Sequence, residues 1–169
     1  LQGLVPEDDV LRLAVLLAEA GVDEIGLSDT TGMGNPAQVS RLFKRMFQEI
    51  GPLTGAAHLH NTRGLGLANG LAAYEAGVRT FDSSPGGLGG CPYAPGASGN
   101  VVTEDLVFMF EAMGVRTGID IGLVGKIGTR ANTRLDPHGR ACRHELLAGF
   151  RRQCDPSFAF RTLTCHANI

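Results

Sequence analysis

The 169-residue sequence has little net charge and no long hydrophobic run. Fifteen basic residues face seventeen acidic ones, a formal net charge of −2, so no overall field attracts nucleic acid or an anionic membrane. No apolar stretch approaches the roughly 18 residues of a membrane span, and the first ten residues lack a basic start and an apolar signal core. We therefore expect a soluble, cytoplasmic protein with no nucleic-acid or membrane partner.

The charge is divided unevenly along the chain. Residues 1–122 carry 7 basic and 14 acidic residues, a net charge of −7, whereas residues 123–169 carry 8 and 3, a net charge of +5. The second segment also holds Cys142, Cys154 and Cys165, without a C-x-x-C pair that would indicate zinc. We expect a partial catalytic domain over 1–122 and a divergent basic tail over 123–169. A shifted reading frame and a small Cys/His metal-binding appendage are the alternatives for the tail.

Apolar positions alternate between helical and strand spacing as far as residue 113. Helices are predicted over 7–20, 36–50, 65–76 and 104–113, and strands over 23–31, 53–61 and 78–83. Asn35 followed by Pro36 marks a helix start, and Thr103 is predicted to cap the last helix. Leu13 of the first helix and Met113 of the last are predicted to face inward. Strands separated by helices indicate right-handed crossovers and a parallel sheet, either an open doubly wound sheet or a (β/α)8 barrel.

Polar side chains lie where the predicted strands end. Asp29 follows the first strand, and His58 and His60 form an H-x-H pair on the second, where a two-residue step sends both imidazoles to one face. In both candidate folds ligands bind at the carboxyl ends of the strands. The histidines are predicted either to share a metal ion or to be satisfied by neighbouring hydrogen bonds. For Asp29 the alternative is a cap of the turn before Gly32.

A glycine-rich loop occupies residues 86–100, with six glycines, two prolines and Cys91. Glycine and proline exclude a helix or the interior of a central strand there. No Gly-Lys-Ser or Gly-Lys-Thr ending follows, which argues against a phosphate-binding P-loop. Glycines around a lone cysteine let the backbone approach a ligand and let the loop move as a lid. Cys91 is therefore predicted to be functional, with a buried structural thiol as the alternative.

Four segments carry a resemblance to a known family. They are GLSDTTGMG (26–34), HLHNTRG (58–64), the run 82–100 that ends in GGLGGCPYAPGASGN, and TEDL (103–106). Through them, residues 24–121 resemble the 3-hydroxy-3-methylglutaryl-CoA lyase family of metal-dependent (β/α)8 barrels. The cysteine-glycine loop is characteristic of that family, whereas H-x-H is shared with condensing relatives such as isopropylmalate synthase. The resemblance implies an α/β fold that is the C-terminal half of a TIM barrel, about strands 5 to 8.

The resemblance also implies a reaction and its residues. The H-x-H pair and Asn100 resemble the family's ligands for Mg²⁺ or Mn²⁺, Cys91 its catalytic thiol and Asp29 its active-site carboxylate. The implied reaction is a retro-Claisen cleavage of 3-hydroxy-3-methylglutaryl-CoA into acetyl-CoA and acetoacetate, a step of leucine degradation and ketone-body metabolism. In it, Asp29 and His58 share proton transfer at the hydroxyl, and Cys91 protonates the enolate carbon. Glu104 is predicted either to contact Asn100 or to complement the dipole of its helix.

The same resemblance implies that the site is incomplete. The family's early metal-ligating aspartate and the arginine beside it have no match in this sequence, and a whole barrel has roughly 250 residues. We therefore expect little or no turnover by the isolated chain, with two open strand edges. A missing barrel half or a second copy of the chain would complete the site. A non-catalytic half-barrel scaffold is the alternative function.

Overall fold

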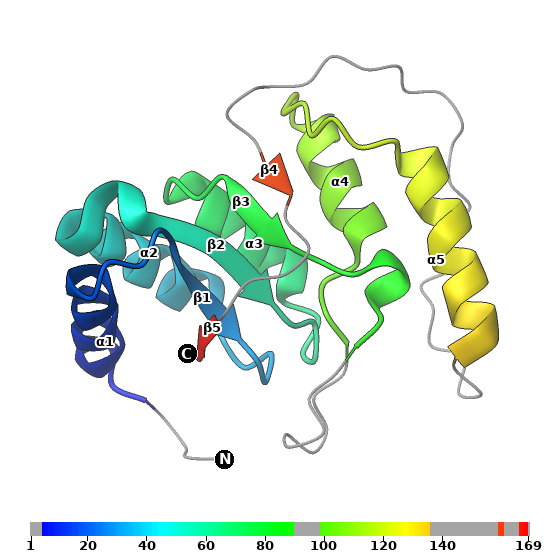
Figure 1. Cartoon of the computed structure of the whole chain (residues 1–169). Coiled ribbons are helices and arrows are strands. Elements are labelled where there is room, and N and C mark those ends of the chain that lie inside the picture. The colour runs from blue at the N-terminus through cyan, green and yellow to red at the C-terminus, as the bar shows by residue number, and fades with distance from the viewer. Residues whose placement is uncertain (1–4, 90–98, 136–158, 161–165, 169) are drawn as a thin grey trace.

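The structure is a computed structural model that describes residues 5–89, 99–135, 159–160 and 166–168 (Figure 1). As far as α4, helices and strands follow each other in the predicted order. The elements are α1 (Glu7–Glu19), β1 (Ile25–Asp29), α2 (Pro36–Ile50), the 3₁₀ turn η1 (Gly51–Leu53), β2 (Thr54–Leu59), α3 (Gly66–Glu75), β3 (Thr80–Asp82), the 3₁₀ turn η2 (Pro85–Gly87), α4 (Thr103–Ala112), α5 (Ile121–Leu135), β4 (Ala159–Phe160) and β5 (His166–Asn168). Within the described part of the chain, no helix has the length and apolar character needed to cross a membrane.

The strands form one five-stranded sheet in the order β4-β3-β2-β1-β5. Every neighbouring pair is parallel, which confirms the predicted α/β fold with a parallel sheet. The short strands β4 and β5 come from the C-terminal segment and pair with β3 and β1. The described sheet is still open, and its two edges are β4 and β5, which were not predicted.

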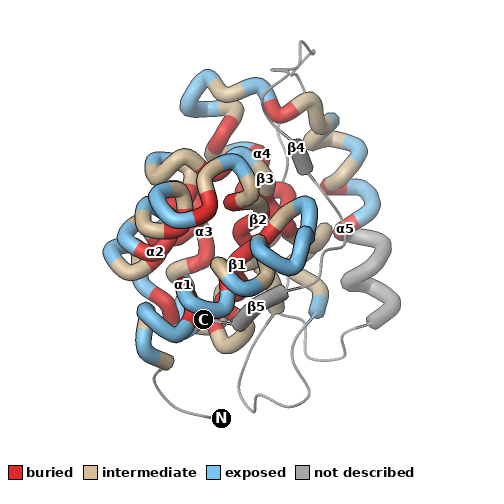
Figure 2. The backbone as a smooth tube through the Cα atoms, turned by 60° about the vertical axis from the view of Figure 1, so that its left-hand side comes forward, coloured by how far each residue is buried: buried red, intermediate tan, exposed pale blue. Residues whose placement is uncertain are grey.

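Helices cover one face of this sheet. In Figure 1, α2 and α3 lie behind the strands, with α1 beside α2. The hydrophobic core lies between these layers, and Figure 2 shows the buried residues along the strands and on the inner sides of the helices. Its members include Leu27, Ala57, Leu59 and Phe81 from the strands and Leu42, Phe43, Met46 and Phe110 from the helices. Because strand side chains alternate, the intervening residues lie on the opposite face.

The second helix begins as the sequence predicts. Asn35 is its N-cap, with Oδ1 accepting a hydrogen bond from Gln38 N at 3.0 Å, and Pro36 is its first residue. An ion pair joins this helix to α1, since Arg41 Nε donates to the Glu7 carboxylate oxygens at 3.1 and 3.0 Å. The hydrogen bond from Arg41 holds the pKa of Glu7 below its ordinary value.

Three helix details differ from the prediction. Thr103 is the first residue of α4 and not its cap, because its Oγ1 lies 2.8 Å from Ser83 Oγ at the end of β3. Leu13 and Met113 are 47% and 45% exposed, so they lie on helix sides turned away from the core. The helix α5 was not predicted. It spans residue 122, where we expect the boundary between the catalytic domain and the basic tail. That boundary remains a prediction.

Candidate active site

The carboxylate of Asp29 holds the loop that follows β1. Its Oδ1 accepts a hydrogen bond from Met33 N at 3.0 Å, and its Oδ2 accepts one from Gly34 N at 2.9 Å. The residue is only 2% exposed. A Cβ on Gly34 would lie 2.9 Å from Oδ2, so only a glycine allows this close approach without a shift. These contacts are those of a turn cap, the alternative that the sequence left open.

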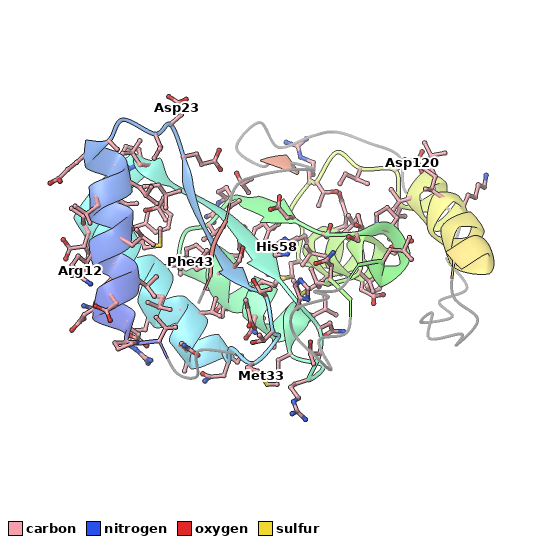
Figure 3. All side chains as sticks on the ribbon, turned by 60° about the horizontal axis from the view of Figure 1, so that its bottom comes forward. Arg12, Asp23, Met33, Phe43, His58 and Asp120 are labelled. Atoms are coloured by element: carbon pink, nitrogen blue, oxygen red, sulfur yellow. The ribbon has the colours of Figure 1, made fainter. Side chains whose placement is uncertain are left out.

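The two histidines of the H-x-H pair lie together, as expected from their spacing. Their ring centroids are 5.2 Å apart in an edge-to-face arrangement. His60 is 5% exposed and the His58 side chain 20% exposed, and Figure 3 shows His58 near the middle of the molecule. Asp29 is aligned with Leu59 and not with a histidine. The structure therefore places Asp29 on the helix-covered face and the histidines on the other.

The end of the glycine-rich loop returns alongside β2. Backbone hydrogen bonds of 3.1 and 2.9 Å join residues 99–101 to residues 59–61. His60 and Asn100 are partners in an isolated antiparallel bridge. Two of the predicted metal ligands, distant in sequence, are thus neighbours in the fold.

The side chain of Asn100 is held by its nitrogen. Nδ2 donates to Ser84 Oγ at 2.8 Å and to the carbonyl oxygen of Leu88 at 3.0 Å. Oδ1 is buried and has no hydrogen-bond partner among the described residues. A buried carbonyl oxygen without a partner is costly, so this atom is available to a ligand.

The predicted ligand set fits a divalent cation in its chemistry. Two imidazoles and one amide oxygen suit an intermediate or hard ion. Asn100, whose Oδ1 has no hydrogen-bond partner among the described residues, is the bridge partner of His60. Over the residues that the structure describes, no group of three or more His, Cys, Asp or Glu side chains could hold a metal ion. A metal site here therefore needs the amide oxygen of Asn100 together with the two histidines, and further ligands from outside the described residues.

Glu104 binds the start of the glycine-rich loop. Its two carboxylate oxygens accept hydrogen bonds from Gly86 N at 3.1 and 2.9 Å, and the residue is 7% exposed. Gly128 of α5 packs against the same carboxylate, where an added Cβ would lie 2.1 Å from Oε1. Glu104 thus joins η2, α4 and α5. Cys91, the predicted thiol of this loop, lies outside the described residues.

The structure adds Asp82, which the sequence reading did not single out as a site residue. Asp82 Oδ2 lies 3.8 Å from Nδ1 of His58, and the two residues are aligned on neighbouring strands. The available signal was a carboxylate at the last position of a strand that precedes the loop with Cys91. Asp82 falls inside the predicted strand 78–83, but alternation alone did not show that it lies on the same face as the histidines, which depends on the register of β3 against β2.

The fold and these contacts define a class of protein: a parallel α/β protein with a polar candidate ligand site at the carboxyl ends of its central strands. The family model described as HMGL-like matches residues 2–129. The chain belongs to this family.

Individual relatives agree with that assignment. Hydroxymethylglutaryl-CoA lyase of Pseudomonas mevalonii is 44% identical over 139 residues, which are 82% of this chain and 46% of that protein. (R)-Citramalyl-CoA lyase of Chloroflexus aurantiacus is 47% identical over 119 residues, 70% of this chain and 38% of that protein. The solved structure of an HMG-CoA lyase from Acinetobacter baumannii, in complex with coenzyme A and 3-methylmalate, has 48% identity and a TM-score of 0.74, covering 78% of this chain and 43% of that one. The chain thus spans less than half the length of these relatives.

Proposed function

We propose that this chain provides the metal-binding side of a carbon–carbon lyase that cleaves 3-hydroxy-3-methylglutaryl-CoA to acetyl-CoA and acetoacetate. The observation that carries the proposal is that the His58 and His60 rings lie together at the end of β2 and that His60 is the bridge partner of Asn100, whose buried Oδ1 has no hydrogen-bond partner among the described residues. The lyases among its relatives support the reaction, and the relative with bound coenzyme A and 3-methylmalate supports an acyl-CoA substrate.

We further propose that the parallel sheet is part of a (β/α)8 barrel whose other strands complete the site. Its helices lie on one face and the row of Ser28, His58 and Asp82 on the other, and in such a barrel the helices likewise form an outer ring around the strands. The completing half, or a second copy of this chain, would supply the remaining ligands. By this proposal the chain alone shows little or no turnover.

The reaction requires two proton transfers and the cleavage of one carbon–carbon bond. In our proposal His58 serves as a metal ligand, and a base of the completed site takes the proton of the C3 hydroxyl. The C2–C3 bond then breaks and its electrons enter the thioester enolate. Cys91 then gives a proton to the enolate carbon. A bound Mg²⁺ or Mn²⁺ would supply positive charge beside the hydroxyl oxygen. Asp29 shapes the loop after β1 through its two hydrogen bonds, and its expected share in the proton transfer at the hydroxyl stays a prediction.

A second substrate has specific support. The (R)-citramalyl-CoA lyase is as similar to this chain as the hydroxymethylglutaryl-CoA lyases are. Both thioesters therefore belong in the assay.

A chimera tests the proposal. The matched segment of this chain replaces its counterpart in the Pseudomonas mevalonii lyase, and thioester cleavage is followed with both substrates in the presence of Mn²⁺. We expect turnover of 3-hydroxy-3-methylglutaryl-CoA, and its loss on Cys91→Ala with Mn²⁺ binding retained. Asn100→Ala is expected to weaken Mn²⁺ binding. A folded chimera that binds Mn²⁺ without cleaving either thioester would instead favour a scaffold.

A further inference from the structure

A row of polar residues crosses the centre of the sheet. Ser28 of β1 is aligned with His58 of β2, and His58 is aligned with Asp82 of β3. The row one position earlier, Leu27 and Ala57, is part of the core beneath the helices. Since aligned residues of parallel strands share a face, Ser28, His58 and Asp82 all lie on the face opposite the helices.

Within this row Asp82 faces one particular nitrogen of His58. Its Oδ2 is 3.8 Å from Nδ1, a separation for an electrostatic contact and not for a hydrogen bond. Asp82 is 7% exposed, and Nδ1 of His58 is a buried atom. Little water separates the two groups, so the charge of the carboxylate acts on Nδ1 with little screening.

A negative charge beside one ring nitrogen decides where a neutral imidazole keeps its proton. The proton is favoured on the nitrogen that faces the carboxylate, and the lone pair is then left on the other nitrogen. Carboxylates behind metal-ligating histidines act in this way, by fixing the tautomer and the orientation of the ring. For His58 this leaves Nε2 as the nitrogen with a lone pair.

We propose that Asp82 is a positioning residue that holds neutral His58 as the Nδ1–H tautomer and so leaves Nε2 ready to bind a divalent cation. The assignment of the tautomer stands on the geometry of this chain alone. Its use for a cation rests on the proposed function. Asp82 touches neither metal nor substrate and acts through His58.

The tautomer can be measured directly. The full 169-residue chain is labelled with ¹⁵N at histidine, and long-range ¹H–¹⁵N correlations are recorded without metal at about pH 8, where an unperturbed histidine is neutral. The signals of His58 are assigned by their loss in His58→Asn. We expect Nδ1 of His58 to carry the proton in the wild-type chain.

Two variants flank His58 in the row. Asp82→Asn keeps the shape of the side chain and removes its charge, so we expect the Nε2–H tautomer to gain population in the chain and the affinity of the chimera for Mn²⁺ to fall about 10- to 100-fold. Asp82→Glu is expected to restore much of both. Ser28→Ala is the matched control on the other side of His58, because the Ser28 hydroxyl is buried without a hydrogen-bond partner in the described structure. It should change neither readout.

The outcomes separate this inference from the proposed function. If the wild-type chain carried its proton on Nε2 of His58, the inference would be overturned before any variant is measured. An unchanged tautomer in a folded Asp82→Asn chain would overturn it as well. The expected tautomer and its shift in Asp82→Asn, together with a folded chimera that binds no Mn²⁺, would support the positioning role and contradict the proposed metal site.

Discussion

At the scale of the residue, Asp29 is a buried carboxylate that satisfies two backbone N–H groups at once. An asparagine has only one oxygen, so in Asp29→Asn its amide group would face one of the donors from Met33 and Gly34. Leaving a buried donor unsatisfied costs about 1 to 3 kcal/mol. We therefore predict a loss of that size in the free energy of unfolding of Asp29→Asn, measured by urea denaturation of the full chain.

The control for this prediction is Asp23→Asn. Asp23 is exposed and precedes the same strand, so its replacement should stay within about 0.5 kcal/mol. Equal stabilities for the two variants would show that the loop does not depend on the carboxylate of Asp29. Asp29 would then be open again to a purely chemical role.

The spacing of residues along one strand predicted which side chains share a face of that strand, but not which residues of two different strands lie side by side. The two-residue step of His58 and His60 was sufficient to place both rings together, because alternation is a local property. The separation of Asp29 from them depends on the register of β1 against β2. Register is set by packing and by a shift between Ile25 and Leu27, and neither can be read from β1 alone.

At the scale of the element, α5 approaches the base of the glycine-rich loop through the backbone of Gly128. A Cβ at this position would lie 2.1 Å from Oε1 of Glu104 and 3.1 Å from Gly86 N. Gly128→Ala must therefore displace the carboxylate or the helix. We predict a loss of about 1 to 3 kcal/mol in unfolding free energy, with faster hydrogen exchange at the amide of Gly86, followed by NMR.

The same helix offers a matched control in Gly122. An added Cβ there has its nearest neighbour, Asp120 Oδ1, at 3.4 Å. Gly122→Ala should be neutral or stabilise by up to about 1 kcal/mol, since alanine favours a helix more than glycine does. If both substitutions behaved alike, close packing of α5 on Glu104 would be excluded.

Elements with strong local signals were predictable, and those that depend on distant partners were not. The helix α2 has an N-cap, a first-turn proline and a regular apolar stripe, and it begins where these features predict. The start of α4 was misplaced because Thr103 hydrogen bonds to Ser83 of another element. The glycines of α5 weaken a helical pattern. That helix is in contact with η2 and α4, which lie earlier in the chain.

At the scale of the whole molecule, the acidic and basic segments meet in one sheet. The net negative residues 1–122 supply β1 to β3, and the net positive residues 123–169 supply β4 and β5 at the two edges. Composition separated these segments but could not show that their strands pair. Long-range pairing of short strands leaves little trace in local sequence, which is why β4 and β5 were not predicted.

The stability of the whole fold should depend on pH through the ion pair between α1 and α2. The hydrogen bond from Arg41 lowers the pKa of Glu7 in the folded chain, whereas the unfolded chain keeps an ordinary value of about 4.3. The resulting stabilisation is fully present above the unfolded pKa and is lost as the pH falls through the folded one. We therefore predict that Glu7→Gln lowers the urea midpoint at neutral pH and that its deficit relative to wild type shrinks from about pH 5 to about pH 3. Asp9→Asn, which removes an exposed pair with Arg12, should have a smaller effect. A deficit of Glu7→Gln that stays constant with pH would mean that packing of the side chain, and not its charge, joins the two helices.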